Sequence, residues 1–398
     1  TVIKLSNNEN PYGLSPLAAQ AIQRRMAQGL GRYPDPAGKV LCAMLAHKHA
    51  VDPACVMLGN GSENLLELLC QAVLCPGDRV VTQLPCFGLH EIFPRMMGAR
   101  VDKVPCTRTF AFHESAWRQA LGSTAKLVLV SQPSNPLGTA YTTAELQTLI
   151  QLTPADCLLV IDEAYVEYAS AGPDYPDALA LLRDQDRPWL VLRTFSKAYG
   201  LASLRVGYGI AGEPGLIQAL HRVRTPYNVN LLAQEAACAA LQDTAHLARS
   251  VALVSAERAR LTQALQQAGL RVAPSQANFL FIDTGTDATQ VVQALQRHGV
   301  IVKAWAEPGY QTFIRMSLAL PADNDVFLQA LLREIHHPKG ARDPAQGVNQ
   351  PGSARFIPRL QVVAEQLGRD LSNVTVTTGD TAATAMGLGG SNSRQTVV

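Results

Sequence analysis

The protein has 398 residues, and its 34 Lys and Arg against 32 Asp and Glu leave a formal net charge of only +2. This balance argues against binding to nucleic acid or to an acidic membrane surface, because such partners attract a clustered excess of positive charge. With 47% hydrophobic and 17% charged residues, the chain can bury a large core, which excludes a mainly disordered protein and favours two or more domains.

No apolar run approaches the ~18 residues that a membrane span requires, and residues 1–10 lack the charged and then apolar order of a secretory signal. The eight cysteines form neither a Cys-x-x-Cys pair nor a cluster with histidines at zinc spacing. We therefore expect a cytoplasmic protein without a metal site, in which most cysteines are small core residues.

Apolar runs alternate with amphipathic stretches between about residues 15 and 335, which predicts an α/β fold with a mostly parallel sheet covered by helices on both faces. Helices are expected at 62–74, where leucines recur at helical spacing, and at 143–152, behind a capping threonine. Buried strands are expected at 79–82, 126–131, 157–162, 189–194 and 206–210.

A second set of elements follows a helical stretch from residue 230 to about 269, which is broken near Asp243. Strands at 270–272, 279–282, 300–302 and 313–318 are expected to alternate with helices at 287–298 and 323–335. This order favours a smaller α+β domain. The expected organisation is an N-terminal arm at 1–14, a large domain at 15–243, a small domain at 244–337, a linker at 338–359 and a tail without an assigned role at 360–398.

The linker is rich in Gly, Pro and Ala, a composition typical of chain between folded parts. Within the tail, 360–367 is predicted to be helical and 373–377 to be a strand. No element is expected at the C-terminal end of the chain.

Five polar residues lie just after the apolar runs of the large domain. In a parallel sheet these positions fall at the carboxyl ends of strands, where ligands bind in such folds. Asp162 ends a run too apolar to hold a carboxylate without a cationic partner. The five residues are Asn135, Asp162, Tyr165, Lys197 and Arg205.

The segment RTFSKAYGLASLR places Lys197 after the hydroxyls of Thr194 and Ser196 and eight residues before Arg205. Pyridoxal 5'-phosphate requires such a set: a lysine amine for the imine, an anion-binding group for the phosphate, and an acid, here Asp162, that holds a pyridinium proton.

Two upstream segments fit the same cofactor. The turn GNGSE, with Gly61 and Ser62, opens a helix whose free N–H groups and dipole favour a phosphate. Phe87 follows a proline turn and could lie flat against an aromatic ring. Each feature is common by itself, but together in this order they favour a pyridoxal-phosphate site.

These motifs make the chain resemble the histidinol-phosphate aminotransferase branch of the fold-type I pyridoxal-phosphate enzymes. The resemblance runs from about residue 3 to 335 and includes KLSNNENPYGLSP, RYPDP, GNGSENLLELL, NPLGT, VIDEAYVEY, RTFSKAYGLASLRVGY and FIRMSLAL. It implies a large pyridoxal-phosphate-binding domain, a small domain and a homodimer.

The resemblance also implies roles for residues that match the motifs. Lys197 would be the Schiff-base lysine and proton shuttle, Asp162 would pair with the pyridine nitrogen, and Tyr165 and Asn135 would hydrogen-bond the ring oxygen O3'. Tyr33 would reach the phosphate of the neighbouring subunit. The phosphate would be held by Gly61, Ser62, Ser196 and Arg205, with Glu63 giving only its backbone N–H.

For the substrate, Arg315 in FIRMSLAL matches the arginine that binds an acidic group, since a guanidinium meets a carboxylate through two hydrogen bonds. Asn10 in NENP matches a position close to the site. Phe87 stands where the family usually has tyrosine, and Lys303 where it commonly has an arginine for the substrate's distal anion.

Two features lie outside the family pattern. The chain begins at KLSNNENP, so the family's preceding arm, with a tyrosine that helps to bind substrate, is expected to be absent. The tail resembles a short interior piece of the large subunit of molybdenum hydroxylases, too short to form that family's domain, so it is expected to carry no activity and the chain could join unrelated reading frames.

The resemblance thus implies transamination between histidinol phosphate and 2-oxoglutarate in histidine biosynthesis, by a ping-pong mechanism. An aromatic amino acid aminotransferase of the same fold is the nearest alternative. A threonine-phosphate decarboxylase-like enzyme, a non-catalytic cofactor-binding regulator and an inactive fragment stay open.

Overall fold

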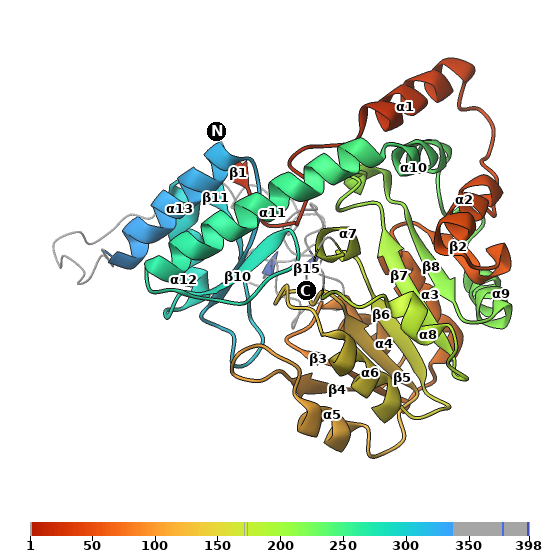
Figure 1. The fold of residues 1–398 in the computed structure, drawn as a ribbon, viewed down its shortest axis with the longest axis horizontal. Coiled ribbons are helices and arrows are strands. Elements are labelled where there is room, and N and C mark those ends of the chain that lie inside the picture. The colour runs from red at the N-terminus through yellow and green to blue at the C-terminus, as the bar shows by residue number, and fades with distance from the viewer. Residues whose placement is uncertain (1, 171, 173, 337–375, 378–395, 398) are drawn as a thin grey trace, which may run out of the picture. The chain divides into compact units, whose positions relative to one another are not determined.

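The computed structural model describes residues 2–170, 172, 174–336, 376–377 and 396–397. One compact unit comprises Thr1–Pro338 and a second comprises Lys339–Val398. Every described helix belongs to the first unit (Figure 1). The predicted domain boundaries stay predictions.

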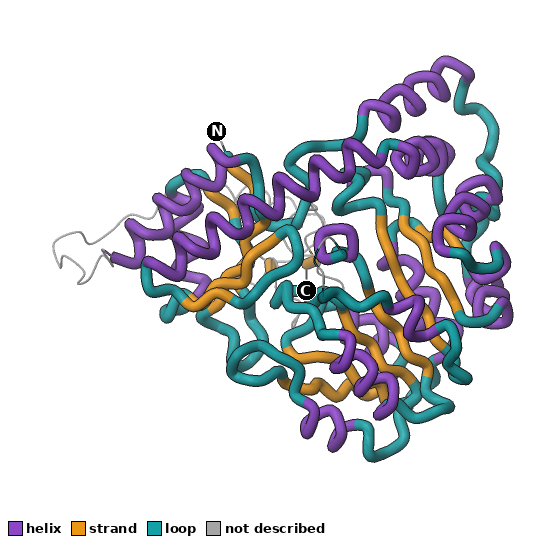
Figure 2. The backbone as a smooth tube through the Cα atoms, viewed as in Figure 1, coloured by secondary structure: helices purple, strands orange, loops and turns teal. Residues whose placement is uncertain are grey.

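The centre of the first unit is a sheet, orange in Figure 2, whose strands follow the order β2-β8-β7-β6-β5-β3-β4. As the sequence predicts, this sheet is mostly parallel. β8 runs antiparallel to both of its neighbours, and the other neighbouring pairs are parallel. The strands are β2 (Val56–Gly59), β3 (Arg79–Leu84), β4 (Arg100–Pro105), β5 (Leu127–Ser131), β6 (Leu158–Asp162), β7 (Trp189–Thr194) and β8 (Gly207–Ala211).

Both faces of this sheet are covered, which explains the near-continuous apolar sequence of its central strands. Along β5 and β6, alternate side chains enter two different cores: Val128 and Leu159 join the core on one face, and Leu127 and Leu158 join the core on the other. β5, β6 and β7 are fully buried. Such a scaffold holds the loops at its strand ends in fixed positions.

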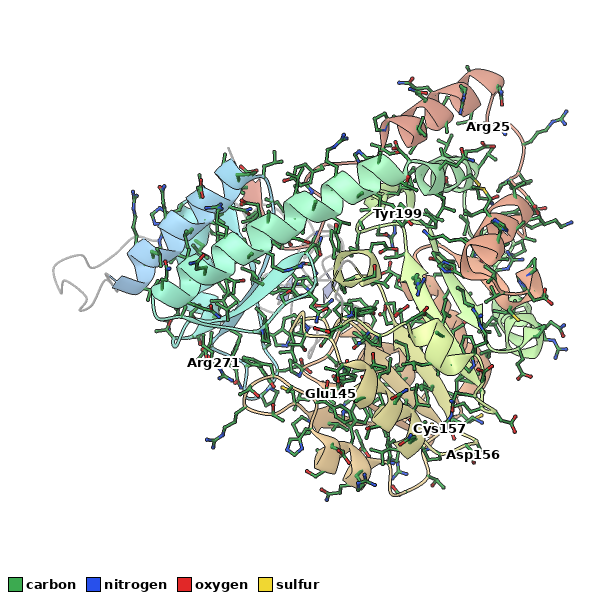
Figure 3. All side chains as sticks on the ribbon, in the orientation of Figure 1. Arg25, Glu145, Asp156, Cys157, Tyr199 and Arg271 are labelled. Atoms are coloured by element: carbon green, nitrogen blue, oxygen red, sulfur yellow. The ribbon has the colours of Figure 1, made fainter. Side chains whose placement is uncertain are left out.

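The helices around the sheet begin at recognisable caps. α6 has a capping box, in which Thr142 accepts from the backbone N–H of Glu145 and the Glu145 side chain accepts in return. On α1, Arg25, labelled in Figure 3, pairs with Glu235 of α10. The helices are α1 (Pro16–Gln28), α2 (Lys39–His49), α3 (Ser62–Val73), α4 (Leu89–Met96), α5 (Glu114–Ala120), α6 (Thr143–Leu152), α7 (Val166–Ala169), α8 (Ala178–Leu182), α9 (Pro214–Val223) and α10 (Leu231–Gln242), with 3-10 turns at Pro53–Cys55 and Ala202–Leu204.

A second, antiparallel sheet in the order β12-β13-β10-β9 follows in the chain. The predicted break at Asp243 is confirmed, because Asp243 separates α10 from α11 and caps α11. Helices α11, α12 and α13 pack on this sheet around Phe279, Ile314 and Phe327 (Figure 1). These elements are α11 (Thr244–Gln267), β9 (Arg271–Val272), β10 (Phe279–Asp283), α12 (Ala288–Arg297), β12 (Lys303–Ala304), β13 (Phe313–Ser317) and α13 (Pro321–His336).

The N-terminal segment predicted as an arm forms a strand. β1 (Ile3–Lys4) pairs in parallel with β11 (Val300–Ile301), and Leu5 enters the core of the second sheet. The first residues are therefore tied to a part of the chain about 300 residues away, which places residues 6–8 at a fixed position beside the second sheet.

In the second unit, β14 (Val376–Thr377) lies within the predicted strand and pairs antiparallel with β15 (Thr396–Val397). The expectation of no element at the C-terminal end is therefore wrong, because a strand pairing between distant residues is not visible as a local pattern. The predicted linker and the helix at 360–367 lie outside the described residues. Among the residues that the structure describes, no helix is long and apolar enough to cross a membrane.

Candidate active site

The carboxyl edge of the central sheet brings the predicted residues together. Asp162 ends β6, Asn135 follows β5 and Lys197 follows β7, and these three strands are parallel. Arg205 precedes β8, which runs antiparallel to β7 with Gly207 opposite Thr194. The reversal of β8 therefore brings Arg205 to the same edge from the beginning of a strand, so its predicted place after a strand end is wrong.

Lys197 is largely enclosed at this edge. Its Nζ donates to the backbone oxygen of Asn7 over 3.0 Å and lies 5.8 Å from the centre of the Tyr165 ring. Burial, with the nearby positive charges of Arg315 and Arg205, lowers the pKa of Lys197 to about 8. At pH 7 about a tenth of the amine is therefore neutral and nucleophilic, far more than for a lysine with the ordinary pKa of 10.5.

A chain of hydrogen bonds joins the second sheet to the first. Arg315 on β13 donates through Nη1 to Oδ1 of Asn135 over 2.6 Å and through Nη2 to the backbone oxygen of Ser6 over 2.7 Å. Asn135 Nδ2 lies 3.4 Å from the hydroxyl of Tyr165. Arg315 Nε is buried without a hydrogen-bond partner among the described residues, which leaves a donor for an anionic ligand.

Asp162 has a partner that sequence reasoning missed. Nε2 of the fully buried His90 lies 3.1 Å from Asp162 Oδ2, and the backbone N–H of Ala164 donates to Oδ1 over 3.2 Å. The His90 ring also meets Phe87 edge to face, with 5.7 Å between ring centres. The sequence predicts that Asp162 needs a partner but not which residue it is, because no fixed spacing links the two. The signal that could have pointed to His90 is its position three residues after Phe87.

The turn before α3 forms an anion cradle. Gly61 caps α3 with φ of 80°, and a Cβ at this position would lie 2.4 Å from Arg205 Nη2, so the close approach of Arg205 requires glycine. Arg205 Nη1 donates to Ser196 Oγ over 3.2 Å, and Thr194 Oγ1 donates to the same oxygen over 3.0 Å. No side chain caps α3, so the N–H groups of its first turn, including that of Ser62, can bind a phosphate.

Glu63 differs from its expected role. Its Oε1 accepts from Arg205 Nη2 over 2.7 Å, so the side chain, and not only the backbone, takes part in the cradle. The two residues are 142 positions apart, and only the fold brings them into contact.

Three predicted residues have other surroundings. Tyr33 is 80% exposed and stacks on Tyr227, so within a single chain it does not join the site. Asn10 donates to the backbone oxygen of Ala198 over 2.8 Å and to Ser250 Oγ over 2.9 Å, so it braces the residue after Lys197. Lys303, which is exposed, lies opposite Arg315 in the register of β12 and β13.

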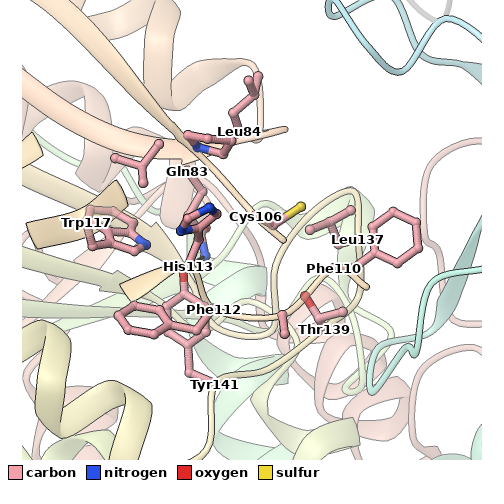
Figure 4. Close-up of a pocket in the computed structure, with 13 residues that line it drawn as sticks. Gln83, Leu84, Cys106, Phe110, Phe112, His113, Trp117, Leu137, Thr139 and Tyr141 are labelled. Carbon is pink, nitrogen blue, oxygen red and sulfur yellow. Dashed lines mark hydrogen bonds between the residues drawn. The ribbon is translucent and has the colours of Figure 1, made fainter. Parts of the chain in front are cut away.

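A cluster beside Phe87 could suggest a cation site. Atoms of Cys86, Glu91 and Glu307 lie within 4.8 Å of one another. However, Lys103 Nζ pairs with both glutamates, at 2.7 Å from Glu307, so an ammonium already balances their charge. The pocket in Figure 4 lies elsewhere, between β3, β4 and the loop after Asn135, and its lining includes no predicted site residue.

The fold and this edge define the class of the protein, a fold-type I transferase with a lysine amine beside an anion cradle. The chain belongs to the family described as aminotransferase class I and II, whose model matches residues 1–331.

Individual relatives agree with this assignment. The chain is 46% identical over 334 residues to histidinol-phosphate aminotransferase 3 of Rhizobium meliloti, covering 83% of this chain and 89% of that protein. It is 44% identical over 330 residues to histidinol-phosphate aminotransferase 1 of Mesorhizobium japonicum, with the same coverage. A crystal structure of histidinol-phosphate aminotransferase from Sinorhizobium meliloti in complex with pyridoxal-5'-phosphate superposes with a TM-score of 0.79 at 30% identity, over 85% of this chain and 91% of that one.

Proposed function

We propose that the protein is a pyridoxal-phosphate-dependent aminotransferase that moves an amino group between histidinol phosphate and 2-oxoglutarate in histidine biosynthesis. The observation that carries this proposal is the convergence of Lys197, Asp162 and the Arg205 cradle at one sheet edge. Relatives at 44–46% identity that bear the name histidinol-phosphate aminotransferase support the substrate.

The residues fit this cofactor at both ends. The cradle formed by the start of α3, Ser196 and Arg205 offers hydrogen-bond donors and positive charge to a phosphate. Glu63, which pairs with Arg205, is its one acidic member among the described residues. Asp162, held by His90, would offer a carboxylate to the pyridine nitrogen. When bound there, pyridoxal phosphate supplies an electron sink for a substrate that loses its Cα proton.

The chain's own groups then do the acid and base work. Lys197 Nζ, with a pKa of about 8, can take a proton from the substrate's Cα and return it to a neighbouring carbon. Tyr165, whose ring centre lies 5.8 Å from Lys197 Nζ, and its neighbour Asn135 would hold the cofactor's ring oxygen.

Arg315 would bind the carboxylate of glutamate, because its Nε has no partner among the described residues and its other nitrogens are fixed by Asn135 and Ser6. Lys303, opposite Arg315 on the adjacent strand, would attract the distal phosphate or carboxylate. A lysine gives this contact charge without a bidentate geometry.

Addition of L-glutamate to the cofactor-loaded protein tests the proposal. The absorbance band of the resting cofactor should disappear and a pyridoxamine phosphate band should replace it, and imidazole acetol phosphate should restore the first band. Lys197→Ala should retain bound cofactor but show neither change. Unchanged spectra of the native protein with glutamate would reject a transaminase.

An aromatic substrate is the second candidate, because aromatic rings surround the guanidinium of Arg315. Its Cζ lies 5.8 Å from the Trp305 ring centre, and Trp305 packs edge to face on Phe281. Rates with histidinol phosphate and with phenylalanine, measured under the same conditions, distinguish the two substrates. A higher kcat/KM for phenylalanine would favour the aromatic enzyme.

The functional unit that we propose is a homodimer. Tyr33 and Tyr227 form an exposed stacked pair, 4.4 Å between ring centres, and exposed apolar side chains at Met26, Leu30 and Val40 lie in the same N-terminal region. Tyr33 would complete the cradle of a second copy. Sedimentation of the native protein and of Tyr33→Phe should both give a dimer, while the variant should lose cofactor more readily.

A further inference from the structure

Asn8 lies inside the site although it was not among the predicted residues. Only 1% of it is exposed, and it adopts a left-handed backbone conformation with φ of 55°. Its backbone N–H donates to Ser317 Oγ over 2.7 Å, and its backbone oxygen accepts from Asn278 Nδ2 over 3.0 Å. Asn8 is therefore fixed to the second sheet on both sides.

The side-chain amide of Asn8 has one orientation that satisfies all its neighbours. The Ser317 hydroxyl already accepts from the Asn8 backbone, so its own hydrogen is directed to Asn8 Oδ1, 3.0 Å away. Asn8 Nδ2 consequently faces the hydroxyl of Tyr165 at 2.9 Å and donates to it.

Asn135 is oriented in the same way by Arg315. Because Arg315 is a donor only, Asn135 presents Oδ1 to it, and Nδ2 is left to face Tyr165 at 3.4 Å. The Tyr165 oxygen thus has an amide N–H on two sides. A phenol oxygen that accepts from two donors must direct its single hydrogen elsewhere, and burial raises the pKa of Tyr165, so that hydrogen is retained.

We propose that Asn8 is a positioning residue that, together with Asn135, compels the Tyr165 hydroxyl to donate its hydrogen into the cofactor space. This inference rests on the proposed function, because the acceptor would be the ring oxygen of the bound pyridoxal phosphate. It assigns to the N-terminal segment a part in setting the protonation of the cofactor.

The test is a pH titration of the cofactor's absorbance in the loaded protein without substrate. A ring oxygen that loses a full hydrogen bond carries more negative charge and holds the cofactor's titratable proton more tightly. Asn8→Gly retains the left-handed backbone but removes the amide, and it should raise the titration midpoint by about half to one pH unit. Asn8→Asp, which cannot donate, should shift the midpoint in the same direction.

A double-mutant cycle separates positioning from a general structural effect. In a Tyr165→Phe background, Asn8→Gly should cause no further shift. Asn324 provides the matched control, because its amide is also fully buried and hydrogen-bonded but lies beside Glu257, outside the site. Asn324→Gly should lower the thermal midpoint and leave the absorbance titration unchanged.

Three outcomes are decisive. The inference is overturned, while the proposed function stands, if Asn8→Gly shifts the titration midpoint equally in the native and the Tyr165→Phe backgrounds. It is also overturned if neither Asn8 variant shifts the midpoint. If an Asn8 variant does not fold, Ser317→Ala, which frees the same amide, must raise the midpoint in its place. A native protein that binds no cofactor refutes the proposed function itself.

Discussion

His90 Nε2 lies 3.1 Å from Asp162 Oδ2, and the two side chains reach each other from α4 and from the end of β6. A carboxylate oxygen is an acceptor only, so His90 donates from Nε2 to Asp162. His90 also contacts Phe87, and it thus links the candidate pyridine partner to the ring expected to stack on the cofactor.

Replacement of His90 should weaken cofactor binding. His90→Phe leaves a buried carboxylate oxygen without a partner, at a cost of about 1–3 kcal/mol, so the dissociation constant should rise by roughly 5- to 150-fold. Titration of the cofactor-free protein with pyridoxal phosphate, followed by absorbance, measures this dissociation constant. His90→Gln, which can still donate, is the control and should lose less. Equal affinities for all three proteins would show that this contact does not support Asp162.

The reactivity of Lys197 should depend on pH in a defined window. Its lowered pKa of about 8 means that half of the amine is neutral at about pH 8, well below the ordinary value of 10.5. The rate of cofactor uptake by the cofactor-free protein should therefore rise with pH and level off above about 9. Arg315→Gln removes one of the positive charges and should move the midpoint upward. A native rate that rises only near pH 10 contradicts the burial of this amine.

Glu307 joins the second sheet to the loop that carries Phe87. Its Oε2 accepts from the backbone N–H of Cys86 over 3.1 Å and from Trp305 Nε1 over 2.7 Å, and its Oε1 accepts from Lys103 over 2.7 Å. Glu307→Ala should lower the free energy of unfolding by about 2 kcal/mol, because several enclosed donors lose their acceptor. Urea unfolding measures this difference.

A surface pair provides the comparison for Glu307. Glu114 and Arg118 form an exposed pair one helical turn apart on α5, with more than half of each side chain accessible. Glu114→Ala should change stability by no more than about 0.5 kcal/mol. A similar decrease in unfolding free energy in both variants would mean that the Glu307 contacts stabilise the fold no more than an exposed ion pair does.

Glu167 should make stability depend on pH. Its Oε2 is buried without a hydrogen-bond partner among the described residues, and burial raises its pKa from 4.5 to about 7. The folded protein therefore holds this proton more tightly than the unfolded chain, so the associated stability is present below pH 4.5 and is lost as the pH rises to 7.

Glu167→Gln removes this titration. The free energy of unfolding of the variant, relative to that of the native protein, should increase by on the order of 2 kcal/mol between pH 4.5 and pH 7.5. Above this range the difference between the two proteins should stay constant. Urea unfolding at several pH values measures the difference. An equal difference in unfolding free energy between the two proteins at pH 4.5 and at pH 7.5 would contradict a raised pKa for Glu167.

The sequence predicts the scaffold well where the pattern is local. The near-continuous apolar strands such as β5 and β6 are recognisable because both faces of the sheet are covered, and the caps Thr142 and Asp243 mark helix starts directly. The edge strand β4 alternates between exposed and less exposed residues and was missed, as was the short β2.

The candidate site divides in the same way. Sequence by itself determined the family, and it predicted the lysine, the acid and the phosphate turn, because each lies in a continuous motif whose chemistry is carried by residue type. The tertiary structure decided which partners hold them: His90 on Asp162, Glu63 on Arg205, and Asn8 on Tyr165. These contacts join residues 72 to 157 positions apart, and their distances follow from the strand order and the reversal of β8, which no local spacing encodes.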